Sequence, residues 1–201
     1  MAENNSGKQW GMVIDMRRCT GCHACSVACK SENEVPLGDF RTHVRYFERG
    51  TYPQVRRVFM PIICNHCDDP PCVRACPTQA TYKREDGIVL VNDKTCIGCR
   101  ACMVACPYGA RYLHPRTGTA DKCTYCVHKL DEGVAPACVN TCQGHARIFG
   151  DLNDPASEVY NLIRNNRVTV LKPDLGTEPQ VYYISASIQT TKSEQEAGRG
   201  V

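Results

Sequence analysis

The 201-residue chain lacks several features that would place it in a familiar functional class. It has no apolar run long enough to cross a bilayer, so we do not expect the chain itself to span a membrane. Its first fifteen residues, MAENNSGKQWGMVID, contain no apolar core of the kind that directs export. It also has no glycine-rich phosphate loop, zinc-protease helix motif or nucleophile elbow. We therefore expect no catalytic residues and no small-molecule substrate of its own.

Cysteine, in contrast, is abundant. The chain has 16 cysteines in 201 residues, about 8 per cent, and all of them fall into groups of four with none left over. A disulfide framework needs no such grouping, and cysteines two residues apart bridge poorly. The N-terminus also offers no export signal that would support a disulfide framework. Metal sites are therefore the better interpretation of this pattern.

Two of the four groups are tight and two are loose. The tight groups, CTGCHACSVAC at 19–29 and CIGCRACMVAC at 96–106, share the spacing C-x2-C-x2-C-x3-C. The loose groups are CNHCDDPPCVRAC at 64–76 and CTYCVHKLDEGVAPACVNTC at 123–142. Their order along the chain is tight, loose, tight, loose, and flanking residues also match, such as Gly21 with Gly98 and Ala24 with Ala101. Two copies of a two-site module explain this pattern better than four unrelated sites.

The spacing of the tight groups selects the metal. Zinc prefers two separated cysteine pairs, so the group at 123–142 alone would pass for a zinc ribbon. The tight spacing is instead that of bacterial ferredoxins, in which three cysteines hold one four-iron cluster and the fourth ligates its neighbour. We therefore predict four [4Fe-4S] clusters, with a structural zinc-binding interaction protein as the minor alternative. Each tight group must exchange a ligand with one loose group, and the spacing leaves open which group pairs with which.

Cluster binding changes what the net charge indicates. The formal charge of +3 hints at nucleic acid, but four clusters of roughly −2 each, thiolates included, change it to about −5. We therefore expect no nucleic-acid partner. Six basic residues near cysteines are candidates for neutralising the clusters, although ordinary solvated charge is expected for any single one: Arg17, Arg18, Lys94, Arg100, Lys122 and Lys129.

We do not expect the histidines and tyrosines near the cysteines to bind metal or to conduct electrons. His23, His66 and His145 lie beside cysteines, but four thiols are already present in each group, so we expect surface or supporting positions. Four tyrosines are expected to pack rather than to conduct electrons: Tyr82, Tyr108, Tyr112 and Tyr125.

Between the groups the pattern predicts a loop-rich α+β fold with short strands and helices. A strand precedes each tight group and a short helix ends it; a hairpin covers 40–59 around Gly50, and 87–92 form a strand. A helix is expected over 154–166, with Asp154 as its cap and Pro155 in its first turn. Residues 167–173 and 180–185 read as strands, and 189–201 as a disordered tail.

Extended motifs then carry a family resemblance, from about Gly11 to Ile184. They are GMVIDMRRCTGCHACSVACKSENEVP, CNHCDDPPCVRACPTQA, CIGCRACMVACPYGARY and KCTYC…PACVNTC…ARIFGDLNDP. The chain resembles the four-cluster iron–sulfur subunits of molybdopterin oxidoreductases, of the polysulfide or thiosulfate reductase, nitrite-reductase-complex and DMSO-reductase type. Gln143 follows Cys142 where many relatives have proline, so the resemblance names no subtype.

The resemblance implies a non-catalytic electron-transfer subunit of an oxidoreductase complex in anaerobic respiration. It would relay electrons between a polytopic, quinone-reactive membrane subunit and a molybdopterin (Mo or W) catalytic subunit. Membrane association within the complex is implied, on the extracytoplasmic face through export with the catalytic subunit; the cytoplasmic face is the alternative. A cytoplasmic electron-transfer subunit of the formate dehydrogenase or hydrogenase type is the alternative function.

The resemblance also implies a topology. An outer ferredoxin-like unit, residues 9–59 with 118–188, contains the first and fourth groups and faces the catalytic subunit. An inner unit, 60–117, is inserted into it, contains the second and third groups and faces the membrane. The implied ligand sets are Cys19, Cys22, Cys25 and Cys142; Cys29, Cys123, Cys126 and Cys138; Cys64, Cys67, Cys72 and Cys106; and Cys76, Cys96, Cys99 and Cys102.

Overall fold

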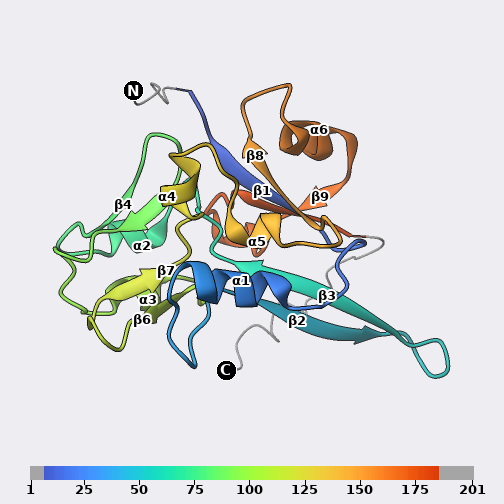
Figure 1. Ribbon diagram of the computed structural model, residues 1–201, viewed down its shortest axis with the longest axis horizontal. Coiled ribbons are helices and arrows are strands. Elements are labelled where there is room, and N and C mark those ends of the chain that lie inside the picture. Colours follow the sequence, from blue (N-terminus) through green and yellow to red (C-terminus); the bar gives the residue numbers. More distant parts are fainter. Residues whose placement is uncertain (1–6, 186–201) are drawn as a thin grey trace.

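A four-stranded sheet forms the centre of the molecule, for which a computed structural model describes residues 7–185 (Figure 1). The strand order is β8-β1-β10-β9, with bounds Trp10–Asp15 for β1, Arg147–Asp151 for β8, Val168–Thr169 for β9 and Val181–Ile184 for β10. β1 pairs antiparallel with β8 and parallel with β10. Its residues Met12, Val13 and Ile14 are fully buried, so the sheet is covered on both faces.

The two faces of this sheet pack against different neighbours. Val13 and Ile148 pack on one side with Val159 of helix α6 (Glu158–Asn165). Met12 and Ile14 pack on the other side with a larger cluster that includes several cysteines. The sheet therefore supports the cysteine-bearing loops on one face and is closed by α6 on the other.

A long hairpin extends from the body of the molecule (Figure 1). It consists of β2 (Thr42–Arg49) and β3 (Arg56–Ile63), paired antiparallel with Thr42 opposite Ile63. Alternate residues at its base, such as Val44, are buried, whereas Tyr52 in its turn is 88% exposed. The base of the hairpin is thus part of the core and its tip is solvated.

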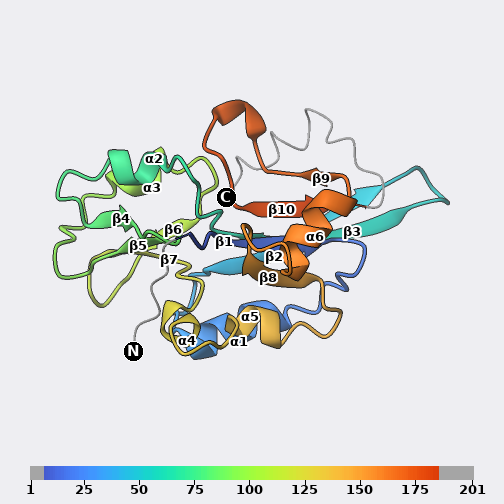
Figure 2. The same cartoon turned by 90° about the horizontal axis from the view of Figure 1, so that it is seen from above.

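Two much smaller hairpins lie on the other side of the molecule (Figure 2). They pair β4 (Thr81–Lys83) with β5 (Val89–Val91), and β6 (Arg111–Leu113) with β7 (Ala120–Lys122). The remaining helices are short: α1 (Ala24–Glu32), α2 (Pro71–Arg74), α3 (Ala101–Ala105), α4 (Val127–Leu130), α5 (Ala137–Asn140) and the 3-10 helix η1 (Pro173–Leu175). α1 packs against α5, and α2 against α3.

Most of the elements expected from the sequence are confirmed. The fold is α+β, a strand precedes and a short helix ends each tight group, and the hairpin spans 42–63. Within residues 7–185, no helix is both long and apolar enough to cross a bilayer. The tail predicted to be disordered, 189–201, lies outside the described residues.

Two boundaries were wrong. The helix expected from Asp154 begins only at Glu158, with Ser157 as its N-cap, because Asp154 closes a turn of its own. The side chain of Asp154 accepts a hydrogen bond from the backbone N–H of Ala156 at 2.8 Å, as an Asx turn does. The strand expected over 167–173 shortens to Val168–Thr169, because the backbone turns into a left-handed conformation at Lys172 (φ 48°).

Candidate iron–sulfur sites

The structure gathers twelve of the sixteen cysteines around three cavities. Site 1 is lined by Cys19, Cys22, Cys25 and Cys142; site 2 by Cys29, Cys123, Cys126 and Cys138; and site 3 by Cys64, Cys67, Cys72 and Cys106. Each combines cysteines from two groups that are distant in sequence.

Short helices explain how one group serves two sites. Cys25 and Cys29 are four residues apart on α1, which places them on the same helix face about 6 Å apart along the axis. Cys25 faces site 1 and Cys29 faces site 2. Cys138, on the neighbouring helix α5, lines site 2, while Cys142, four residues on, lines site 1. Helix α1 and the segment from α5 to Cys142 therefore each contribute one cysteine to each of the two sites.

The remaining cysteines, Cys76, Cys96, Cys99 and Cys102, form what we call site 4. Cys102 lies on α3, which packs against α2, and Cys76 lies two residues after the end of α2. The backbone N–H of Thr81 donates to Cys76 Sγ, and that of Ala120 to Cys96 Sγ, both at 3.5 Å. No described cavity joins these four cysteines, so their grouping stays a prediction.

The surroundings of the sulfur atoms fit iron–sulfur clusters. The backbone N–H of Ala146 donates to Cys142 Sγ at 3.2 Å, and the Asn33 amide donates to both Cys29 Sγ and Cys126 Sγ at 3.7 Å. Such donors stabilise sulfur ligands that carry negative charge. Among the described residues, no three His, Cys, Asp or Glu side chains converge on a single-ion position. Four thiols spread around a cavity instead match the ligands of a four-iron cluster.

Burial controls the protonation of these thiols. It raises the pKa of both Cys29 and Cys67 to about 12, with the neighbouring thiolates Cys138 and Cys64 adding to the effect. Burial likewise raises the pKa of Cys123 well above its ordinary value. Without metal these thiols stay protonated at neutral pH, so metal binding has to release their protons. The iron would supply the positive charge that makes buried thiolates stable.

Comparison with known proteins agrees with this chemistry. Residues 55–152 match the model of a 4Fe-4S dicluster domain, and residues 19–33 match that of a 4Fe-4S binding domain. The chain is 50% identical over 186 residues to the B subunit of tetrathionate reductase from Salmonella typhimurium, covering 90% of this chain and 74% of that protein. It is 49% identical over 181 residues to the protein of the same name from Archaeoglobus fulgidus, covering 90% and 84%. It is 40% identical over 222 residues to the arsenate respiratory reductase iron-sulfur subunit ArrB of Shewanella sp., covering 87% and 95%.

The chain belongs to the family of 4Fe-4S iron–sulfur subunits of respiratory reductases. It is an electron-transfer component of such complexes and not their catalytic part.

Two buried arginines of this subunit were missed by the sequence interpretation. Arg147 is 3% exposed; it donates to Thr42 Oγ1 at 2.7 Å and lies 3.7 Å from Cys138 Sγ. Arg111 is 7% exposed; it donates to Thr81 Oγ1 at 3.2 Å and to Cys72 Sγ at 2.9 Å. Although burial alone would lower it, the pKa of each guanidinium is raised by nearby thiolates. Each arginine thus supplies a fixed positive charge beside the sulfurs.

A signal for these arginines is present in the sequence. Each follows the last cysteine of its group by five residues and is preceded by alanine, in CPYGAR for Arg111 and CQGHAR for Arg147. Of the basic residues singled out from the sequence, Lys122 is buried, donating to the carbonyl oxygen of Cys123 at 2.6 Å. The others are exposed or half-buried, and two form ion pairs, Arg17 with Asp15 and Lys129 with Glu32.

Proposed function

We propose that this subunit carries four [4Fe-4S] clusters, one in each of sites 1–4, and conducts electrons through them in that order. The observation that carries the proposal is the joining of two distant cysteine groups at each of sites 1, 2 and 3. The crossed arrangement is the one implied for the family, with the first group sharing ligands with the fourth and the second with the third. Site 4 completes it by analogy, because α2 packs against α3 as α1 packs against α5.

Neighbouring contacts support the order of the sites. The thiolate of Cys25 in site 1 acts on the pKa of Cys138 in site 2, and that of Cys64 in site 3 acts on Cys123 in site 2. Arg111 faces thiolates of both site 3 and site 4, Cys72 and Cys102 among them. Electrons would therefore pass between neighbours at every step.

Exposure supports a path with two open ends. Cys22 in site 1 and Cys99 in site 4 are exposed, whereas all four cysteines of site 2 are buried. A one-electron carrier needs an entrance and an exit at the surface and insulation between them. Sites 1 and 4 would serve as the two ends, on the proposed outer unit (9–59 with 118–188) and inner unit (60–117).

The partners follow from this arrangement. We assign a molybdopterin catalytic subunit to the site 1 end and a quinone-reactive membrane subunit to the site 4 end, in a membrane-associated complex on the extracytoplasmic face. Two relatives that are 49% and 50% identical are named as tetrathionate reductase subunits, so a sulfur compound is the proposed terminal substrate.

Metal analysis of the anaerobically purified subunit tests the proposal. We expect about sixteen irons and sixteen inorganic sulfides per chain, and a brown visible spectrum. Stoichiometric zinc in a colourless protein would overturn it. Identifying the largest subunit that co-purifies would decide between a molybdopterin sulfur-compound reductase and a formate dehydrogenase or hydrogenase.

A further inference from the structure

The first CxxC pair of each of the four cysteine groups has one backbone feature in common, and in two groups that feature has an energetic cost. The residue before the second cysteine of the group is left-handed in all four: Gly21 (φ 71°), His66 (φ 41°), Gly98 (φ 66°) and Tyr125 (φ 53°). Glycine adopts this conformation freely. A residue with a side chain does so at a cost of about 1–2 kcal/mol. The two loose groups therefore retain a histidine and a tyrosine where glycine would be easier, which points to a use for these two side chains.

The two strained side chains stack on one another. The rings of His66 and Tyr125 lie 3.8 Å apart between centroids, with an interplanar angle of 19°. They are 0% and 1% exposed. His66 stands between Cys64 and Cys67 and lines site 3, whereas Tyr125 stands between Cys123 and Cys126 and lines site 2. The stacked rings therefore lie between site 2 and site 3 and line both of them.

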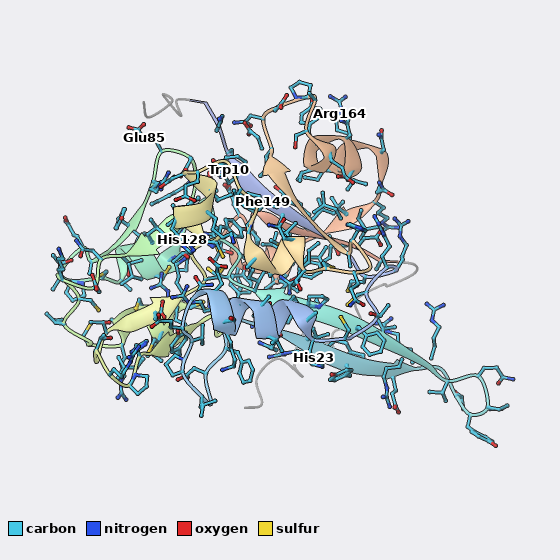
Figure 3. The ribbon with its side chains drawn as sticks, viewed as in Figure 1. Trp10, His23, Glu85, His128, Phe149 and Arg164 are labelled. Atoms are coloured by element: carbon cyan, nitrogen blue, oxygen red, sulfur yellow. The ribbon has the colours of Figure 1, made fainter. Side chains whose placement is uncertain are left out.

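Neighbouring groups fix both rings in place. Tyr125 meets the edge of Phe149 at 5.0 Å between centroids, and Phe149 stacks on Trp10 at 5.2 Å, so β1 and β8 support the tyrosine. Figure 3 shows Trp10 and Phe149 side by side next to the sheet. On the other side, the backbone N–H of Val89 donates to His66 Nδ1 at 3.1 Å.

That hydrogen bond also sets the histidine tautomer. Because Nδ1 accepts a hydrogen bond, the ring proton is on Nε2, which has no hydrogen-bond partner among the described residues. A buried N–H donor in the wall of site 3 lacks an acceptor unless a cluster sulfur provides one.

We propose that the His66–Tyr125 stack is the joint between the two units. It sets the separation of the clusters in sites 2 and 3 and forms the contact across which the electron passes. His66 in addition donates its Nε2–H to a sulfur in site 3. The step transfers one electron, so one cluster is oxidised as its neighbour is reduced, with no proton or bond exchanged. This inference rests on the proposed assignment of clusters to these sites.

The first test replaces the tyrosine in the complete, purified complex. Tyr125→Phe keeps the ring and serves as the matched control, whereas Tyr125→Leu removes the stack and keeps a buried apolar side chain. Under turnover with a quinol donor, frozen samples are read by electron paramagnetic resonance. For Tyr125→Leu we expect electrons to accumulate on the donor side of the joint, with a several-fold slower passage to the far side. Tyr125→Phe is expected to behave as wild type.

A second test, at equilibrium, addresses the histidine. His66→Phe retains the stack but removes the Nε2–H donor, so the potential of the site 3 cluster should fall, because hydrogen bonds to sulfur favour the more negative, reduced state. The other three potentials should stay unchanged. An unshifted site 3 potential would remove the donor role, and wild-type electron distribution in Tyr125→Leu would overturn the joint. Iron content is measured for every variant: a wild type with fewer than four clusters contradicts the proposed function instead.

Discussion

Around the first and fourth cysteine groups the chain builds a four-stranded sheet, helices of nine and eight residues and a long hairpin. Around the second and third it builds only two hairpins, whose strands are three residues each, and two helices of four and five residues. Both regions nevertheless have the same buried pair of an arginine and a threonine, Arg147 with Thr42 and Arg111 with Thr81. The same cysteine pattern therefore occurs with two different amounts of supporting structure.

The core is distributed just as unevenly. In the described part of the chain, the two clusters of buried apolar residues both centre on β1 and its neighbours. From the inner unit, Ile63, Ile88 and Leu90 contribute to the larger cluster, and the inner unit has no apolar cluster of its own within residues 7–185. We therefore expect the proposed inner unit, a segment of 58 residues with so little apolar burial, to depend on its proposed metal sites for stability, as small metal-binding domains do.

Removing the clusters should therefore cause the largest loss of structure, and the largest difference in stability between the two regions. On iron chelation under oxidising conditions, we expect backbone amides of 64–117 to lose nearly all protection from hydrogen exchange, because little else orders them. Amides of β1 and β10 should keep measurable protection. Equal loss in both regions, or retention of the native circular dichroism spectrum, would contradict this difference.

Cysteine variants test which cysteine groups share a cluster. Cys29→Ser and Cys126→Ser should perturb the same electron paramagnetic resonance signal, because both cysteines line site 2. Cys22→Ser should perturb a different one, from site 1. If Cys29→Ser instead altered the signal that Cys67→Ser alters, the groups would pair in sequence order and the crossed arrangement would be wrong. Cross-linking of the complex should in addition place the site 1 surface against the molybdopterin subunit.

Substitution of the two buried arginines, one in each region, should have smaller effects than loss of a cluster. Arg147→Gln should lower the reduction potentials of sites 1 and 2, and Arg111→Gln those of sites 3 and 4, because a positive charge favours the reduced cluster. Each substitution should also destabilise the fold, by roughly 3–5 kcal/mol, since it leaves buried negative charge without its partner. Redox titration followed by electron paramagnetic resonance measures the potentials.

An exposed arginine provides the control for this pair. Arg57 pairs with Glu48 on the hairpin at 2.9 Å, and both side chains are more than half exposed. Arg57→Gln should change stability by less than about 1 kcal/mol and leave all potentials unchanged. A shift of all four potentials in Arg147→Gln would show that the two units are not electrostatically separate.

The sequence predicted the metal chemistry better than the architecture. Cysteine spacing is a local signal, so the 4Fe-4S chemistry followed from it. Which cysteine groups share a cluster came from the family resemblance and stays a prediction. The parallel pairing of β1 with β10 joins residues about 170 positions apart, for which no short-range signal exists. The helix start at Asp154 was wrong because an Asx turn and an N-cap use the same residue types.

Side-chain roles were harder to predict for a different reason. Arg111 and Arg147 were missed because they are five residues from the nearest cysteine of their own group, and only the fold brings them beside Cys72 and Cys138. His66 and Tyr125 were expected to play modest supporting or packing roles, because each is unremarkable within its own group. Their significance depends on a contact between two loops 59 residues apart in sequence.

Losses of stability smaller than those for the buried arginines are predicted at two glycines, Gly21 and Gly98, which occupy in the tight groups the position that His66 and Tyr125 occupy in the loose groups. Gly21→Ala and Gly98→Ala introduce the same methyl group into the same left-handed conformation, one in each unit. A Cβ at Gly21 would meet the ring of Phe59, a side chain that can turn away, whereas at Gly98 it would meet the carbonyl oxygen of Gly118, which is fixed in the backbone. Gly109, also left-handed, has open space around its Cβ position, so an alanine there adds backbone strain without a clash.

We expect Gly109→Ala to lower the free energy of unfolding by about 1 kcal/mol, Gly21→Ala by about 2 and Gly98→Ala by about 3. Anaerobic guanidinium titration, followed by cluster absorbance, measures the order. Equal costs for Gly21→Ala and Gly98→Ala would show that the loop after β6 yields as readily as the Phe59 ring, and that the inner unit is no more tightly constrained at its cysteine loop than the outer one.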